Sequence, residues 1–169
     1  MGRTTIPKNQ VLRQVIENPA LIARELYNRS FYRFFVDFWP EISNDPFIDN
    51  WHIQLLCEEL QMIAESVGDN VEKEHDLLVN IAPGTTKTKI CSVAFPVWCW
   101  TRWPWMQLIT LSYSGALALE SAELSRDVIR SERFKAIYPE LEIKDDKDTK
   151  SNYRIVSRKQ VFPNQPTRS

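Results

Sequence analysis

Apolar residues in the first half of the chain recur at spacings of three and four, the spacing of one helix face. The pair Asn18-Pro19 offers an N-cap followed by proline at the first helical position. A first helix is therefore predicted from there to about Trp39, with Pro40 as its stop. A second helix is predicted to end at Gly68. Its apolar positions are Ile53, Leu56, Leu60, Ile63 and Val67.

Two short apolar runs in the second half predict buried strands. The first spans Leu77 to Ala82, and the second spans Met106 to Ser112. The segment between them predicts a helix that starts near Thr88, and Ser114 is placed to cap a further helix. Strand, helix, strand and helix in this order form a βαβ unit with a parallel strand pair. A weaker third strand is expected around residues 153–157.

A small-residue loop follows the first predicted strand, within the sequence LLVNIAPGTTKT of residues 77–88. Backbone N–H groups at a helix start attract anions, Lys87 can reach terminal phosphates, and the hydroxyl of Thr88 can ligate magnesium. The pattern G-x-x-x-x-G-K-[ST] is met only in part. Ile81 and Thr86 stand at its two glycine positions, and Gly84 alone supplies backbone freedom. From this pattern, a phosphate-binding loop and an ordinary strand–turn–helix junction are both open.

Composition narrows the class of protein. A chain of 169 residues with 43% hydrophobic residues, 25% charged residues and 4 glycines can form one globular domain. Its 3 cysteines form no CxxC pair, and their odd number favours a reduced, intracellular setting over a disulfide framework. The 2 histidines have no neighbouring cysteine cluster, so no zinc site is expected. The N-terminus lacks an apolar core, and Pro96, Arg102 and Pro104 interrupt the apolar segment 90–111. Neither a signal peptide nor a membrane span is therefore expected.

Charge is unevenly distributed although the net charge is −1. Residues 41–76 hold ten acids and one lysine, a net charge of −9. Residues 144–169 hold seven bases and three acids, a net charge of +4. Both segments are compatible with solvated surface, and a DNA-facing role for the basic segment is the alternative.

Four motifs occur in a defined order along the chain. They are the loop LLVNIAPGTTKT, FPVW at residues 95–98, LITLSYS at 108–114 and SRDVIRSERFKAIYP at 125–139. Together they resemble the N-terminal ATPase domain of the large terminase subunit of tailed bacteriophages, the DNA-packaging motor. WHIQLLCEEL at 51–60 is similar to the segment that these proteins carry ahead of the loop. The resemblance covers roughly residues 20–160 and depends on the order and spacing of the motifs.

The resemblance implies roles for individual residues. Lys87 would contact the β- and γ-phosphates of ATP, and Thr88 would hold Mg²⁺. Gln54 would stand where such ATPases often read the adenine, and Arg126 would sense the γ-phosphate or couple the ATP state to DNA. An exposed helix position for Gln54 and a helix-surface salt bridge for Arg126 are the alternatives. The backbone that would cradle the phosphates belongs to Pro83, Gly84, Thr85 and Thr86.

The resemblance also implies a fold and partners. The expected fold is α/β: a P-loop NTPase-like parallel sheet with flanking helices. A helical lead-in at residues 1–75 would precede the front part of the ATPase domain at 76–169. No apolar strand ending in paired acids follows the loop, so the sheet is expected to be incomplete and the chain not to hydrolyse ATP. Expected partners are double-stranded phage DNA, the portal protein, the small terminase subunit and further copies in a ring, in the host bacterial cytoplasm.

The sequence leaves two other functions open. One is another P-loop ATPase, such as a helicase-like motor, which the FPVW and SRDVIRSERF segments disfavour. The other is a truncated, non-catalytic remnant that serves only as an interaction module, which the missing acidic strand favours.

Overall fold

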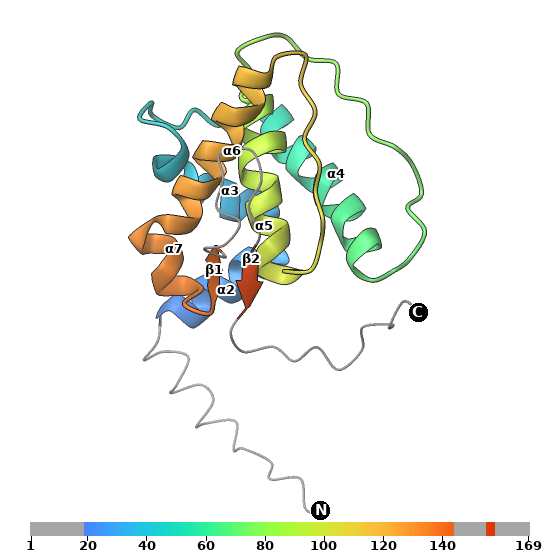
Figure 1. Ribbon diagram of the computed structural model, residues 1–169. Coiled ribbons are helices and arrows are strands. Elements are labelled where there is room, and N and C mark those ends of the chain that lie inside the picture. Colours follow the sequence, from blue (N-terminus) through green and yellow to red (C-terminus); the bar gives the residue numbers. More distant parts are fainter. Residues whose placement is uncertain (1–18, 144–154, 158–169) are drawn as a thin grey trace, which may run out of the picture.

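Helices dominate the computed structural model, which describes residues 19–143 and 155–157 (Figure 1). The helix start predicted at Asn18, the residue Tyr153 and most of the basic segment 144–169 lie outside the described residues. The helical elements are α2 (Pro19–Arg29), α3 (Phe31–Ile42), α4 (Trp51–Gly68), η1 (Lys89–Ala94), α5 (Phe95–Arg102), α6 (Gly115–Arg130) and α7 (Glu132–Ile137).

The prediction of an α/β fold with a P-loop NTPase-like parallel sheet is wrong. In the described part of the chain, the β structure is one antiparallel pair, β1 (Leu141–Ile143) with β2 (Ile155–Ser157). Residues 77–82 and 106–112 belong to no helix or strand; they run as extended segments in Figure 1 and join no ladder. The side chains of Leu78, Ile109 and Leu111 are 92%, 86% and 89% exposed. The two buried strands predicted from the apolar pattern are therefore absent. A strand needs partner strands for its N–H and C=O groups, and these segments have none within the described residues.

The single N-terminal helix predicted up to Trp39 is two helices. Ser30 separates α2 from α3, and its side-chain oxygen accepts a hydrogen bond from the N–H of Arg33 at 3.1 Å, as an N-cap does. Pro40 does not stop α3, which continues to Ile42. A proline near a helix end removes one backbone hydrogen bond, and the burial of Trp39 and Ile42 on the core face offsets that loss.

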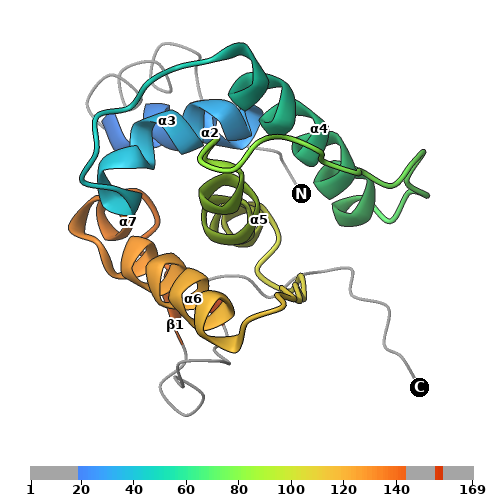
Figure 2. The ribbon, with the colours of Figure 1, turned by 90° about the horizontal axis from the view of Figure 1, so that it is seen from above.

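Helix α5 lies at the centre of the molecule. Figure 2 shows it end-on, with α3 and α4 on one side and α6 on the other. Its residue Trp98 is fully buried, and its indole N–H donates to the backbone oxygen of Tyr27 at 2.7 Å. Four phenylalanines of α3 are also fully buried in this core: Phe31, Phe34, Phe35 and Phe38.

The helix that leads into α5 contains a π-helical stretch. Residues 87–102 are continuously helical, and η1 widens residues 89–94 before α5 begins. The wider turn accommodates Pro96, which has no N–H to offer the preceding turn. The buried hydroxyl of Ser125 in α6 lies 2.9 Å from Ser121 O of its own helix, and it also lies 3.2 Å from Val93 O and 3.4 Å from Ser92 O of this stretch. This contact fixes α6 against the helix behind the loop.

Several predictions about helices are confirmed. Helix α4 ends at Gly68, and Ser114 occupies the N-cap position of α6. Strand β2 lies within the region expected to form a weak strand. Within the described ranges, no helix has both the length and the apolar character that a membrane crossing requires.

Candidate phosphate-binding loop

The loop between the extended segment 77–82 and the central helix has an unusual backbone. Gly84 has φ of 81° and Thr86 has φ of 62°. Glycine adopts this region freely, but for a β-branched residue it is rare and strained. Strained backbone of this kind is found preferentially at ligand-binding and active sites. Thr86 therefore carries a conformational cost in this loop.

Lys87 is folded back over this loop. Its ammonium donates to the backbone oxygen of Ile81 at 2.9 Å, and its side chain is half-buried. Within the described residues, no carboxylate lies within salt-bridge distance of it. A partly desolvated cation held only by a neutral carbonyl can gain much more from a bound anion.

The start of the helix adds donors to the same loop. Lys87 and Thr88 form the first helical residues, and in the described chain the N–H groups of Thr86, Lys87 and Thr88 donate to no acceptor. Such N–H groups and the positive end of the helix dipole favour an anion. The Thr85 hydroxyl donates to Ala82 O at 2.7 Å and thereby closes the turn.

The charge of Lys87 affects the pKa of a nearby thiol, that of Cys91 in η1. Burial raises the pKa of Cys91 to about 11, and the nearby ammonium of Lys87 partly opposes this rise. Burial also raises the pKa of Cys57 in α4, and Cys91 adds to that rise. Both thiols are therefore protonated at neutral pH, and Lys87 has no thiolate as a counter-ion.

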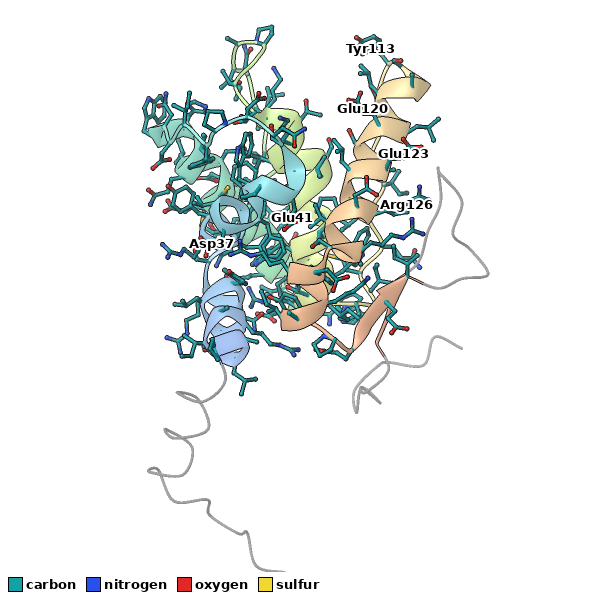
Figure 3. The ribbon with its side chains drawn as sticks, turned by 90° about the vertical axis from the view of Figure 1, so that its left-hand side faces the viewer. Asp37, Glu41, Tyr113, Glu120, Glu123 and Arg126 are labelled. Carbon is teal, nitrogen blue, oxygen red and sulfur yellow. The ribbon has the colours of Figure 1, made fainter. Side chains whose placement is uncertain are left out.

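The structure does not bring all the predicted site residues together. Residues 83–88 form the loop, whereas Gln54 is exposed on α4 and donates to Glu58 at 2.7 Å, the exposed helix position considered as its alternative. Arg126 is half-buried on α6. Figure 3 shows Tyr113 just before the start of α6 and Arg126 further along the helix than Glu120 and Glu123. The partner that the structure gives Gln54 is thus a neighbour on its own helix and not the loop.

Sequence reasoning missed a second lysine beside the loop. Lys89 donates to the hydroxyl of Ser43 at 2.6 Å and lies over the ring of Trp39, 4.8 Å from its centroid. No short motif joins Lys89 to Ser43, because the two residues lie 46 positions apart in the sequence. The only available signal was the basic residue itself, directly after the Lys87-Thr88 pair.

The described residues around the loop supply only part of a magnesium site. Thr88 is exposed and can offer a hydroxyl oxygen. The described residues contain no group of three or more His, Cys, Asp and Glu side chains that could hold a metal ion. Magnesium is typically bound through one or two carboxylates together with substrate phosphates. The loop thus fits a phosphate group and a single hydroxyl ligand rather than a metal centre of its own.

Comparison with protein-family models, with curated proteins and with solved structures found no match to this chain.

Proposed function

We propose that residues 81–88 bind the phosphates of a nucleoside triphosphate. The observation that carries the proposal is the position of Lys87, whose ammonium crosses the loop to Ile81 O at 2.9 Å without a carboxylate partner in the described residues. A phosphate oxygen can replace that carbonyl as acceptor and form a charge-assisted hydrogen bond. The unused N–H groups of Thr86 to Thr88 supply further donors.

The wider role that we propose is the nucleotide-binding part of an ATP-driven motor of the large terminase type, with ATP and Mg²⁺ as its cofactors. The order of the loop, FPVW, LITLSYS and SRDVIRSERF motifs supports this role. The proposal does not depend on a parallel sheet. Under it, the partners are double-stranded phage DNA, the portal protein, the small terminase subunit and other copies of the chain in a ring, in the host bacterial cytoplasm.

Calorimetric titration of the chain with MgATP and with inorganic triphosphate tests the proposal. Lys87→Ala should weaken binding of both ligands by about 2–3 kcal/mol, because one charge-assisted hydrogen bond is lost. Lys135→Ala is the matched control, since Lys135 is an exposed lysine paired with Glu132 in α7. Equal affinity of the wild type and Lys87→Ala would reject the phosphate-binding assignment.

An interaction module is the second candidate, and one observation favours it. The extended segments expose large apolar side chains, with Leu78 92%, Leu111 89% and Tyr113 96% exposed. Exposed apolar surface of this kind commonly marks a contact with another macromolecule. A wild-type chain that binds neither MgATP nor triphosphate, yet folds cooperatively, would favour this candidate over the ATP-binding one.

A further inference from the structure

We propose that Lys89 is a positioning residue, which holds the first turn of the loop helix against the C-terminal end of α3 and does not itself bind phosphate. The inference deepens the proposed function and rests on it. It assigns different tasks to two lysines that are only two positions apart.

The ammonium of Lys89 has two partners on the C-terminal end of α3. It donates to Ser43 Oγ at 2.6 Å and lies 4.8 Å from the centre of the Trp39 ring. The Ser43 hydroxyl donates in turn to a carboxylate oxygen of Asp45 at 3.2 Å, and it also accepts the Asp45 N–H at 3.3 Å. A carboxylate thus compensates the charge of Lys89 through one hydroxyl, so little is gained by moving it to a phosphate.

The residues that receive Lys89 are themselves fixed. Trp39 is 5% exposed, and its indole N–H donates to Asp45 O at 2.7 Å. Its ring makes edge contacts with the rings of Phe35 and Phe47, with ring centroids 5.6 Å and 5.5 Å apart. Ser43 is the C-cap of α3, where the helix dipole favours a cation. Lys89 therefore docks on a rigid part of the core.

Lys87 and Lys89 face different directions. Two helical positions correspond to a rotation of roughly 200° about the axis, so side chains at these positions leave opposite faces. Lys87 crosses the loop to Ile81 O, whereas Lys89 reaches α3. Because Lys89 is the first residue of η1, holding it also sets the direction of the preceding N–H groups. The N-terminal helices would in this way determine the geometry of the phosphate site.

The test combines substitutions at both lysines with triphosphate and MgATP titrations. Lys89→Met, which keeps the aliphatic stem and removes the charge, should weaken triphosphate binding by roughly 3–10-fold. Lys89→Arg should keep triphosphate affinity close to that of the wild type, because a guanidinium can stack on Trp39 and donate to Ser43. Ser43→Ala is a milder second variant with an effect in the same direction. Lys73→Met is the control, since Lys73 is an exposed lysine that pairs with Asp76.

The decisive readout is non-additivity. If Lys89 acts by orienting the loop and Lys87, Lys89→Met should cause a clearly smaller loss in a Lys87→Ala background than in the wild type, because the part of its effect that acts through Lys87 is already gone. A full additional loss in that background would mean that Lys89 contacts phosphate directly and would overturn the inference. A lower unfolding midpoint with unchanged affinity would overturn it as well, while leaving the proposed function intact. A wild type that binds no triphosphate would overturn both.

Discussion

At the scale of single residues, the environment of a side chain rather than its type separates a binding group from a structural one. Lys87 and Lys89 are both half-buried lysines at the start of one helical run. Lys87 meets a neutral carbonyl, whereas Lys89 meets a hydroxyl that is bonded to a carboxylate. Only Lys87 retains an uncompensated charge, which is the property that an anion site needs.

The strained backbone of the loop leads to the first prediction at this scale. Gly84→Ala should lower the free energy of unfolding by about 1–2 kcal/mol, because a Cβ is disfavoured at a φ of 81°. Apart from the adjoining backbone, no atom lies within 4 Å of the Cβ position at Gly84 or at Gly115, so Gly115→Ala is a control that differs in backbone conformation and not in space. Equal effects of the two substitutions in urea denaturation would show that the loop does not hold this conformation in solution.

Thr86 offers the converse substitution. Thr86→Gly should raise the free energy of unfolding by about 1 kcal/mol, because glycine adopts a φ of 62° without strain. The gain is reduced by the loss of the hydrogen bond from the Thr86 hydroxyl to Thr85 O at 2.5 Å. Denaturation of Thr86→Gly beside the wild type measures the balance. A loss of stability would mean that the hydroxyl contact outweighs the strain.

At the scale of elements, α4 and the end of α5 are fitted closely to each other. Arg102 donates to Glu65 at 2.5 Å, and its guanidinium lies 4.3 Å from the centre of the Trp103 ring. A Cβ added at Gly68 would lie 2.1 Å from an atom of that same ring. The absence of a side chain at the last residue of α4 is therefore required by packing and not only by helix termination.

Gly68→Ala should consequently destabilise the protein. Alanine is the better helix former by about 1 kcal/mol, but displacing the Trp103 ring should cost about 1–3 kcal/mol. The control is the same substitution in a Trp103→Leu background, where the penalty should largely disappear. A higher melting temperature for Gly68→Ala alone would contradict the packing seen here.

Helix ends were predictable from the sequence, whereas strand pairing was not. The end of α4 and the cap of α6 were predictable, because helix periodicity and termination depend on residues close in sequence. The strands predicted at 77–82 and 106–112 were wrong, because pairing depends on distant partners that a local pattern does not report. Within the site, the residues of the loop were predictable from their order. The contact between Lys89 and Ser43 was not, because it joins positions 46 apart.

At the scale of the whole molecule, buried thiols make the free energy of unfolding depend on pH in the alkaline range. Burial raises the pKa of Cys57, Cys91 and Cys99, in the case of Cys91 from 9.0 to about 11. The folded state therefore holds these protons more tightly than the unfolded state does. Their contribution to stability is complete below pH 9 and is lost as the pH rises towards 11 and beyond.

Urea midpoints should accordingly be constant between pH 7 and 8 and fall above pH 9. Cys91→Ala should reduce the slope of that fall. Cys57 and Cys99 maintain part of the remainder, and Tyr27, Tyr32 and Tyr138, whose pKa values burial also raises, add to it above pH 10. Midpoints measured at several pH values for the wild type and Cys91→Ala provide the comparison. Identical slopes would show that Cys91 is not shielded from water to the degree described.

The backbone of residues 84–88 is proposed to bind phosphate, and amide NMR reports on these N–H groups directly. Titration of the isotopically labelled chain with inorganic triphosphate should shift the amide signals of residues 84–88 most strongly. Residues of α2, which begins at Pro19, should be unaffected. Lys87→Ala should reduce both the size of the shifts and the apparent affinity. Shifts that are absent, or that cluster away from residues 84–88 and persist in Lys87→Ala, would contradict the claim.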